Sequence, residues 1–290
     1  MQLGVSAYSY AKLINGGNFS LFDAIGHAKR VGFDAIEFTD LAPPPGQSAE
    51  SCALELRQAC EAAGLGVACY SVQADFLSGS GGDAAREAAR VMACADIAKA
   101  LGAPNMRHDA AWGFKSPERG RGYRDAIRMI SGPIREVAAY AEKLGVRTMT
   151  ENHGHFMQDS ARMEALVLAV GHPNYGLLVD IGNFMCADEQ SLAALPAVMP
   201  YAFHVHAKDF LWKSGLEPRP DSSWFPTRAG SHLRGTVLGH GAVAAAQCLK
   251  YIAGTGYGGA VSLEFEGLED PLEAVRLGHD FMAACLREGI

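Results

Sequence analysis

The sequence has no block of basic residues, no low-complexity segment and no apolar run near the roughly 20 residues that a membrane span requires. Its formal net charge is −7, and acidic and basic side chains are mixed along the chain. Proteins that bind nucleic acid usually carry a positive stripe. The composition therefore argues against nucleic acid and against a membrane as partners.

Paired cysteines are also missing. The chain has seven cysteines, an odd number, and none of them forms a C-x-x-C pair. This pattern favours buried thiols in a reducing compartment over disulfides. The first ten residues, MQLGVSAYSY, lack the charged segment of a signal peptide and lead directly into a strand-like pattern. We therefore expect a cytoplasmic protein.

What the sequence does contain is one unit, repeated several times. Each copy has an Ala-rich amphipathic stretch, a glycine, and a short apolar run that ends in polar residues, as in AIGHAKRVGFDAIEFTD and VAAYAEKLGVRTMTEN. The glycine is typical of a helix C-terminus, and the apolar run is typical of a strand buried on both faces. The repeat therefore predicts alternating helices and parallel strands with right-handed connections.

The repeat can be counted along the chain. The expected strands lie near residues 3–8, 34–38, 66–71, 104–108, 146–151, 176–181, 202–207 and 260–265. The expected helices lie near residues 20–31, 48–63, 84–101, 117–144, 160–170, 189–198, 243–253 and 270–287. These elements predict one (β/α)8 TIM barrel domain over residues 1–290. A doubly wound sheet is the alternative, but no G-x-G-x-x-G follows the first strand.

One connection is unusually long. Residues 210–240, FLWKSGLEPRPDSSWFPTRAGSHLRGTVLGH, read as an irregular βα loop after the seventh strand. Long loops of this kind are commonly lids or binding loops. We therefore expect this loop on the face of the barrel where the strands end.

Titratable residues gather at the strand ends. The fourth to eighth expected strands end in MRHD, MTENHGH, LLVDIGN, FHVHAKD and VSLEFEG. In a barrel these ends share one mouth, and the two histidines of HVHAKD, at i and i+2, point to the same face of their strand. Converging Glu, Asp and His predict a nitrogen and oxygen site for Mn²⁺, Mg²⁺, Co²⁺ or Zn²⁺.

Four of these strand ends resemble the signature of the xylose isomerase-like barrels. They are Glu151 in TENHG, Asp180 in LLVDIGNF, His206 in VHAKD and Glu264 in VSLEFEG. The closest subset resembles the sugar phosphate isomerase/epimerase group, which includes ketose 3-epimerases and inosose-processing enzymes. The resemblance implies that these residues hold one divalent metal, with Mn²⁺ as the expected ion. It also implies a small carbohydrate substrate and a homo-oligomer, either a dimer or a tetramer.

The resemblance implies that Glu151 and Glu264 shuttle protons, and the expected chemistry agrees. Moving a proton between the carbons of an α-hydroxyketone passes through a cis-enediolate, whose two oxygens need a Lewis acid. Two carboxylates on opposite faces can then remove and return the protons. His153, two residues after Glu151, faces the same cavity and is expected to act with them, with loop structure as the alternative.

Other residues of the mouth are expected to contact substrate. His204 either supports the metal site or binds substrate, or it is a core histidine bonded to backbone. Lys208 and Asp209 either bind hydroxyls or pair with each other. Relatives often place a site-ordering residue at Glu37, a histidine at Asn183 and an arginine at Arg234, and all three are expected at the substrate, as is His108.

Aromatic residues are candidates for the rim. Tyr8 and Tyr10 alternate with Ser9 and either line the mouth or pack at the barrel edge. The three tryptophans, Trp112, Trp212 and Trp224, all lie in expected loops. They could stack on a sugar ring or on an aglycone, or they could pack within the loops.

The first functional hypothesis is a metal-dependent isomerase or epimerase of a keto-sugar or cyclic polyol. The alternative is a lyase of the same barrel, either an inosose dehydratase or the metal-bearing subunit of a C-glycoside deglycosidase acting on 3-keto-glycosides, which would need a second subunit. A DNA-repair endonuclease is disfavoured, because strand 3 ends in CYSV without histidine and Asn183 replaces a further ligand. A binding module that has lost catalysis is disfavoured by the complete four-ligand set.

Overall fold

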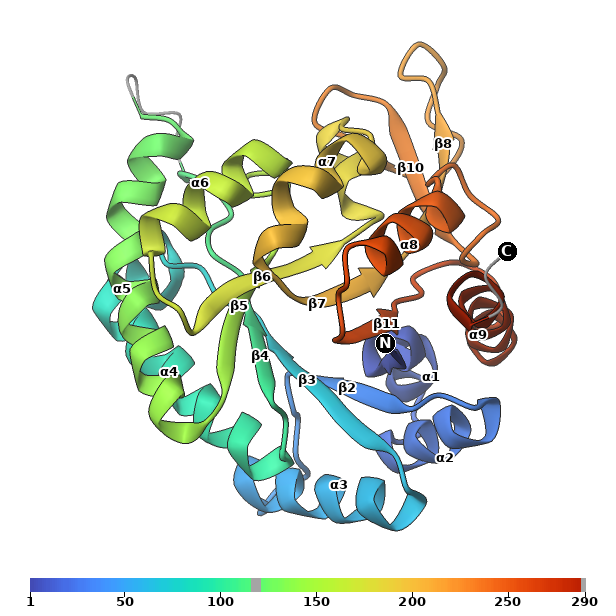
Figure 1. The fold of residues 1–290 in the computed structure, drawn as a ribbon, viewed down its shortest axis with the longest axis horizontal. Coiled ribbons are helices and arrows are strands. Elements are labelled where there is room, and N and C mark those ends of the chain that lie inside the picture. The colour runs from blue at the N-terminus through green and yellow to red at the C-terminus, as the bar shows by residue number, and fades with distance from the viewer. Residues whose placement is uncertain (116–120, 288–290) are drawn as a thin grey trace.

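The computed structural model describes residues 1–115 and 121–287. Parallel strands close into a barrel in the order β1-β11-β7-β6-β5-β4-β3-β2, with helices around it (Figure 1). The barrel strands are β1 (Gln2–Ser6), β2 (Ala35–Thr39), β3 (Gly66–Val72), β4 (Asn105–His108), β5 (Arg147–Glu151), β6 (Tyr175–Asp180), β7 (Ala202–Ala207) and β11 (Ala260–Leu263). The prediction of a (β/α)8 barrel is confirmed.

Helices cover the outside of the barrel. They are α1 (Ala11–Asn15), α2 (Leu21–Val31), α3 (Ala49–Ala63), α4 (Ala84–Leu101), α5 (Tyr123–Leu144), α6 (Ser160–Val170), α7 (Ser191–Val198), α8 (Ala245–Gly254) and α9 (Pro271–Arg287). Short 3-10 turns add η1 (Ala7–Tyr10), η2 (Gly79–Gly81), η3 (Asn183–Ala187) and η4 (Met199–Tyr201). As the repeat predicts, several helices end at a glycine with positive φ, for example Gly64 at 63° and Gly145 at 74°.

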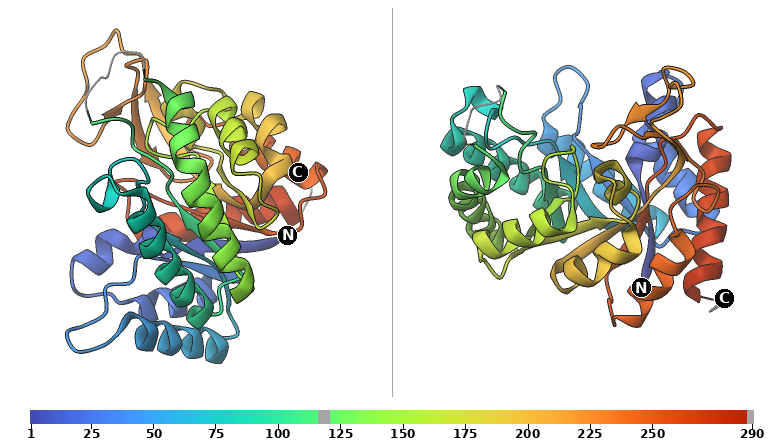
Figure 2. Two further views of the ribbon diagram at one scale, coloured as in Figure 1. Left: turned by 90° about the vertical axis from the view of Figure 1, so that its left-hand side faces the viewer. Right: turned by 90° about the horizontal axis from the view of Figure 1, so that it is seen from above.

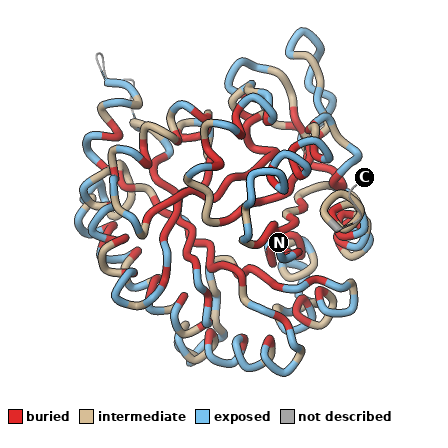
Figure 3. The backbone as a smooth tube through the Cα atoms, viewed as in Figure 1, coloured by how far each residue is buried: buried red, intermediate tan, exposed pale blue. Residues whose placement is uncertain are grey.

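The barrel strands are largely buried, as their colour in Figure 3 shows, because helices cover their outer face and their inner face lies in the barrel interior. All six residues of β6 are buried, and so are all four residues of β11. This explains why the strands read as continuous apolar runs in the sequence. Polar residues therefore concentrate where the strands end, and these ends meet at one mouth.

The observed boundaries differ from the prediction at a few ends. The first strand was expected to reach residue 8 but ends at Ser6, whose side chain accepts a hydrogen bond from the amide of Tyr8 and starts η1. Tyr10 is then fully buried, while Tyr8 reaches the barrel mouth. The predicted helix at 117–144 begins at Tyr123, and its residues 117–120 lie outside the described residues.

The stretch at 210–240 is not an irregular loop, so that part of the prediction is wrong. It forms an antiparallel sheet of β8 (Asp209–Lys213), β9 (Phe225–Pro226) and β10 (His232–Thr236), in the order β8-β10-β9. This sheet projects from the barrel beside α7 and α8 (Figures 1 and 2). The paired residues lie far apart in the sequence, since His232 lies opposite Lys213. No local pattern in the sequence predicts this pairing.

Asp209, the first residue of β8, binds the segment that follows β10. Its carboxylate accepts hydrogen bonds from the amides of Gly239, Gly241 and Val243 over 2.9–3.0 Å. A side chain at Gly241 would collide with this carboxylate, which explains the glycine. Asp209 therefore holds the chain after β10. The sequence suggested two other roles for it, binding of substrate hydroxyls or pairing with Lys208.

Two further expectations concern the whole chain. The seven cysteines, all of them within the described residues, are free. Throughout residues 1–115 and 121–287, no helix is both long enough and apolar enough to span a bilayer.

Candidate active site

Four side chains at the ends of consecutive strands come together in the barrel mouth. The members are Glu151 at the end of β5, Asp180 at the end of β6, His206 in β7 and Glu264 directly after β11, and we call them the four-residue cluster. One donor atom from each residue lies within 4.8 Å of all the others. Nδ1 of His206 is 3.6–3.8 Å from a carboxylate oxygen of each of the other three.

The chemistry of the four-residue cluster fits a divalent cation. Oδ2 of Asp180 and Nδ1 of His206 are buried and lack a hydrogen-bond partner among the described residues. Burial raises the pKa of Asp180 to about 6. The negative charges of Glu151 and Glu264 act in the same direction, and the positive charge of Lys208 opposes them. Buried charges that repel each other are costly unless a cation is bound between them. Oxygen and imidazole donors could hold Mn²⁺, Mg²⁺, Co²⁺ or Zn²⁺.

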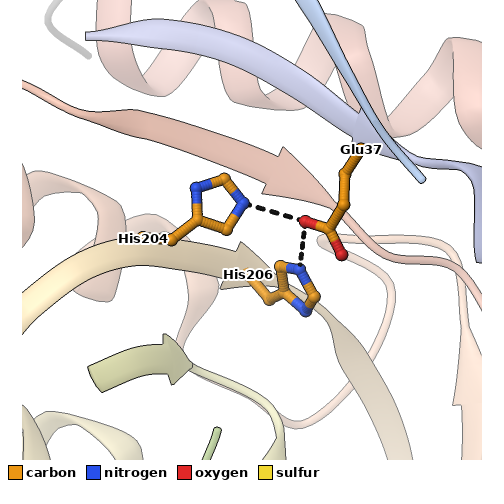
Figure 4. A group of neighbouring side chains, drawn as sticks. All are labelled: Glu37, His204 and His206. Atoms are coloured by element: carbon orange, nitrogen blue, oxygen red, sulfur yellow. Dashed lines mark hydrogen bonds and ion pairs between the residues drawn. The ribbon is translucent and has the colours of Figure 1, made fainter. Parts of the chain in front are cut away.

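Glu37 in β2 orients His206 by bonding the ring nitrogen that faces away from the cluster. Its Oε2 accepts hydrogen bonds from Nε2 of His206 at 2.8 Å and from Nε2 of His204 at 2.9 Å (Figure 4). Nε2 of His206 therefore carries a proton, and Nδ1 is the ring nitrogen that faces the cluster. Burial raises the pKa of Glu37, but the two histidines outweigh it and hold the pKa below its usual range. The two histidines of HVHAKD thus do share one face.

Lys208 lies against the opposite edge of the cluster. Its Nζ is 2.5 Å from Oε2 of Glu264 and 3.4 Å from Oδ2 of Asp180. Burial lowers the pKa of the amine, but Glu264 and Glu266 raise it well above its usual value, so the amine stays charged. Burial raises the pKa of Glu264, yet Lys208 and His206 hold it at about 2. Lys208 therefore pairs with the cluster and not with Asp209.

Glu151 has a different set of partners. Nη2 of Arg107 lies 2.5 Å from its Oε2, and Nδ2 of Asn183 donates to its Oε1 over 2.9 Å. Arg107 also contacts Asp109 at 2.9 Å, and Nδ1 of His153 donates to the same Asp109 oxygen over 3.0 Å. Burial raises the pKa of Glu151, but Arg107 and His206 hold it well below its usual range. The two glutamates of the cluster thus differ in their surroundings.

These groups line a cavity of about 300 Å³, which we call the main cavity. Its inner wall contains Glu151, His206 and Glu264. Its outer wall contains Tyr8, Asp40, Gln73 and Trp112, together with His153, whose ring lies edge-on to Trp112 at 5.2 Å. The cavity therefore opens from the cluster toward an aromatic and polar rim.

Of the residues expected at the substrate, Glu37 and His204 are hydrogen-bonded to each other beside His206 and do not line the main cavity, and His108 and Arg234 lie elsewhere. His108 faces away from the mouth, edge-on to Phe76 and stacked on Tyr175, and burial lowers its pKa to about 4. Successive strand residues point to opposite faces, so Arg107 reaches the cavity in its place. The guanidinium of Arg234 in β10 lies 5.4 Å from the ring centre of Trp224. Arg234 is not among the described residues that line the main cavity.

The sequence reasoning missed several residues of the main cavity, among them the charged residues Arg107, Asp109 and Glu266. All three stand beside residues that were selected, within MRHD and LEFEG. Alternation along β4 puts Arg107 and Asp109 on one face and His108 on the other, and the structure shows that the first of these faces lines the cavity. Glu266 follows Glu264 at i+2, the same spacing that linked the two histidines of β7.

The comparisons with known proteins agree with this geometry. A family model described as "Xylose isomerase-like TIM barrel" matches residues 25–285. No curated protein sequence matches the chain.

Solved structures share the whole fold. D-allulose 3-epimerase from Methylomonas sp. has a TM-score of 0.73 at 18% identity, over 99% of this chain and 98% of that one. The probable 3-DHS dehydratase AsbF from Bacillus anthracis has a TM-score of 0.73 at 16% identity, over 98% and 99%. A xylose isomerase-like TIM barrel protein from Mycobacterium smegmatis, in complex with magnesium, has a TM-score of 0.69 at 18% identity, over 99% and 97%.

Proposed function

Because this chain belongs to the xylose isomerase-like TIM barrel family, we propose that it is a divalent-metal-dependent isomerase or epimerase of a keto-sugar or cyclic polyol. One observation carries the proposal. Two glutamates, Glu151 and Glu264, share one buried cluster with Asp180 and His206, and two donor atoms of that cluster lack hydrogen-bond partners among the described residues. The epimerase among the structural neighbours supports the same class of reaction.

The four-residue cluster would hold the cation, and Mn²⁺ is the expected ion. Once bound, a divalent cation supplies Lewis-acid stabilisation to the oxygens of an α-hydroxyketone as negative charge develops on them. His206 would present Nδ1 to the ion because Glu37 fixes its other nitrogen.

The glutamates would move the protons. One would remove the proton from the carbon beside the carbonyl, and the other would return a proton from the opposite face. Each is tied to its own cation, Glu151 to Arg107 and Glu264 to Lys208, which orients its carboxylate and keeps it ionised in the free protein. The glutamate that returns the proton would therefore first take one up from solvent, and the glutamate that removed a proton would release it to solvent. His153, held by Asp109 and facing the main cavity, would contact a substrate hydroxyl beside Glu151.

A lyase is the second candidate, because the same enediolate can expel a substituent. The dehydratase among the structural neighbours shares this fold, so the fold alone does not separate the two reactions. A C-glycoside deglycosidase of this type would also need a second subunit, whereas an isomerase is proposed to act as a homo-oligomer.

The test combines metal analysis with product analysis. We expect untagged protein to contain close to one divalent ion per chain, and EDTA to abolish turnover that Mn²⁺ then restores. Incubation with ketohexoses, keto-inositols and 3-keto-glycosides in D₂O should give an epimer or isomer labelled at the carbon beside the carbonyl, as NMR would show. Release of water or aglycone would establish the lyase instead.

A matched pair of variants tests the site. Asp180→Ala removes a ligand of the four-residue cluster, and we expect it to lose metal and turnover together. Asp280→Ala changes an exposed aspartate on α9 and should leave both unchanged. The proposal fails if metal-replete protein binds no ion, or if Asp180→Ala retains turnover.

A further inference from the structure

A second cavity adjoins the main cavity. Its volume is about 210 Å³, and it shares Trp112, His153, Lys208 and Glu266 with the main cavity. A molecule whose reacting carbons lie at the four-residue cluster could therefore extend past these four side chains. Neither the family match nor the proposed reaction assigns a ligand to this space.

Aromatic residues of the small sheet form the outer wall of the second cavity. Phe210 of β8 and Phe225 of β9 both line it, with their ring centres 5.6 Å apart and their planes nearly perpendicular. Phe210 is fully buried and supports the half-buried Phe225. Nζ of Lys208 lies 6.0 Å from the centre of the Phe210 ring, so this lysine stands between the charged cluster and the aromatic wall.

Three of the residues on the inner side of the second cavity, Gln158, Asn183 and Cys186, offer few free polar groups. The side chain of Gln158 donates to the carbonyl of Asn183 over 2.7 Å and accepts from the amide of His155. The side-chain amide of Asn183 donates to Glu151. Burial raises the pKa of the Cys186 thiol to about 12, so that this wall residue stays neutral. The second cavity therefore combines an aromatic wall, formed by Phe210 and Phe225, with the charged groups of Lys208 and Glu266 on the side shared with the main cavity.

We propose that the second cavity is a subsite for a ring-sized substituent with an aromatic face, so that the substrate is a glycoside with an aromatic aglycone and not a free sugar. This inference rests on the proposed function for the position of the sugar. The volume is sufficient, because an apolar cavity of about 150 Å³ can hold benzene. Trp112, which is 49% exposed and lines both cavities, would cover the substituent where it leaves the sugar.

Two exposed tryptophans allow a matched experiment. Trp112 lines both cavities, whereas Trp212 is 50% exposed and lines a separate hollow beside α7. Binding of phenyl β-glucoside and methyl β-glucoside would be measured by isothermal titration calorimetry with full-length protein, both Mn²⁺-loaded and EDTA-treated. Neither ligand is a ketone, so binding is read without turnover.

We expect phenyl glucoside to bind about tenfold more tightly than methyl glucoside, in line with burial of one face of a phenyl ring. Trp112→Ala should remove most of this preference, Phe225→Ala should reduce it, and Trp212→Ala should leave it intact. Equal binding of the two glucosides to the wild type would overturn the proposal, and so would a preference that survives in Trp112→Ala. Loss of metal binding or turnover without loss of the phenyl preference would count against the proposed function alone.

Discussion

Glu37 belongs to the barrel interior, yet it determines which nitrogen of His206 faces the four-residue cluster. Its Oε2 lies 2.8 Å from Nε2 of His206, and Ser71 donates to its other oxygen over 2.8 Å. A glutamine at this position could turn its amide nitrogen toward Nε2, which would favour the wrong imidazole tautomer. Loss of such an outer partner typically costs 10- to 100-fold in metal affinity. We expect Glu37→Gln to weaken Mn²⁺ binding by about this factor in calorimetric titration.

The matched control is another buried glutamate outside the cluster. Glu87 in α4 is 2% exposed and hydrogen-bonded, so Glu87→Gln also changes a buried carboxylate to an amide. It should leave Mn²⁺ affinity unchanged. Wild-type affinity in Glu37→Gln, with the fold intact by circular dichroism, would show that Glu37 does not orient His206.

At the scale of single residues, alternation predicts faces but not absolute register. The shared face of His204 and His206 follows from their i, i+2 spacing alone, and their common bond to Glu37 agrees. The choice between Arg107 and His108 needs the exact phase of β4, which a four-residue strand does not reveal. The partner of Lys208 could not be predicted either, because Glu264 reaches it from a strand more than fifty residues away in sequence.

At the scale of elements, the loop between β3 and α4 is held by a single helix residue. Glu87 accepts hydrogen bonds from the amide of Asp75 at 3.1 Å and the hydroxyl of Ser80 at 2.7 Å, and Arg90 pairs with it at 2.7 Å. Arg90 also donates to the carbonyl of Gln73 over 2.6 Å, and Gln73 lines the main cavity. This arrangement connects the start of α4 to one wall of the candidate active site.

Glu87 should make stability depend on acid pH. Burial raises its pKa, but Arg90, Ser80 and the amide of Asp75 lower it from the ordinary 4.5 to about 2. A lowered folded-state pKa gives stability that is present above about pH 4.5 and is lost as pH falls toward 2. Because Arg90 is 44% exposed and solvent screens its charge, we expect Glu87→Gln to cost only about 1–2 kcal/mol at pH 7.

Urea unfolding of both proteins at pH 7 and at pH 3.5 measures this effect. The difference in unfolding free energy between wild type and Glu87→Gln should shrink at the lower pH. Glu273→Gln is the matched control, since Glu273 pairs with Arg276 at the same i, i+3 spacing but on the exposed face of α9. It should change stability little at either pH. A Glu87→Gln deficit that stays constant from pH 7 to 3.5 would contradict the assignment.

The elements themselves divide into those that local signals specify and those that they do not. The barrel strands and their covering helices follow from apolar runs and terminal glycines such as Gly64 and Gly145, which act within a few residues. The β8-β10-β9 sheet depends on pairs such as Asp209 with Thr236, whose strands are separated by a stretch that contains several prolines and glycines. Pairing over that separation leaves no periodicity for a sequence argument to use.

At the scale of the whole molecule, negative charge of the chain continues into the main cavity. The net charge is −7. Among the described residues the cavity lining carries two permanent cations, Arg107 and Lys208, against five carboxyl groups, Asp40, Asp109, Glu151, Glu264 and Glu266. Both cations are already paired with carboxylates of the four-residue cluster. Neither is therefore left for a phosphate or carboxylate on the substrate.

Even with the proposed divalent cation in the four-residue cluster, the carboxylates of the lining outnumber the positive charges, so this charge distribution predicts a preference for uncharged substrates. We expect kcat/KM for a neutral keto-sugar to exceed that for its phosphate ester by about tenfold or more at low ionic strength, because clefts of one sign repel ligands of the same sign. Raising the salt from about 10 mM to 500 mM shortens the screening length from about 30 Å to a few Å, and this should narrow the gap by improving the ester alone. The neutral sugar serves as the internal control, since its rate should not depend on salt. A phosphate ester that is the better substrate, or a gap that widens with salt, would mean that Arg107 or Lys208 exchanges its carboxylate partner for the phosphate.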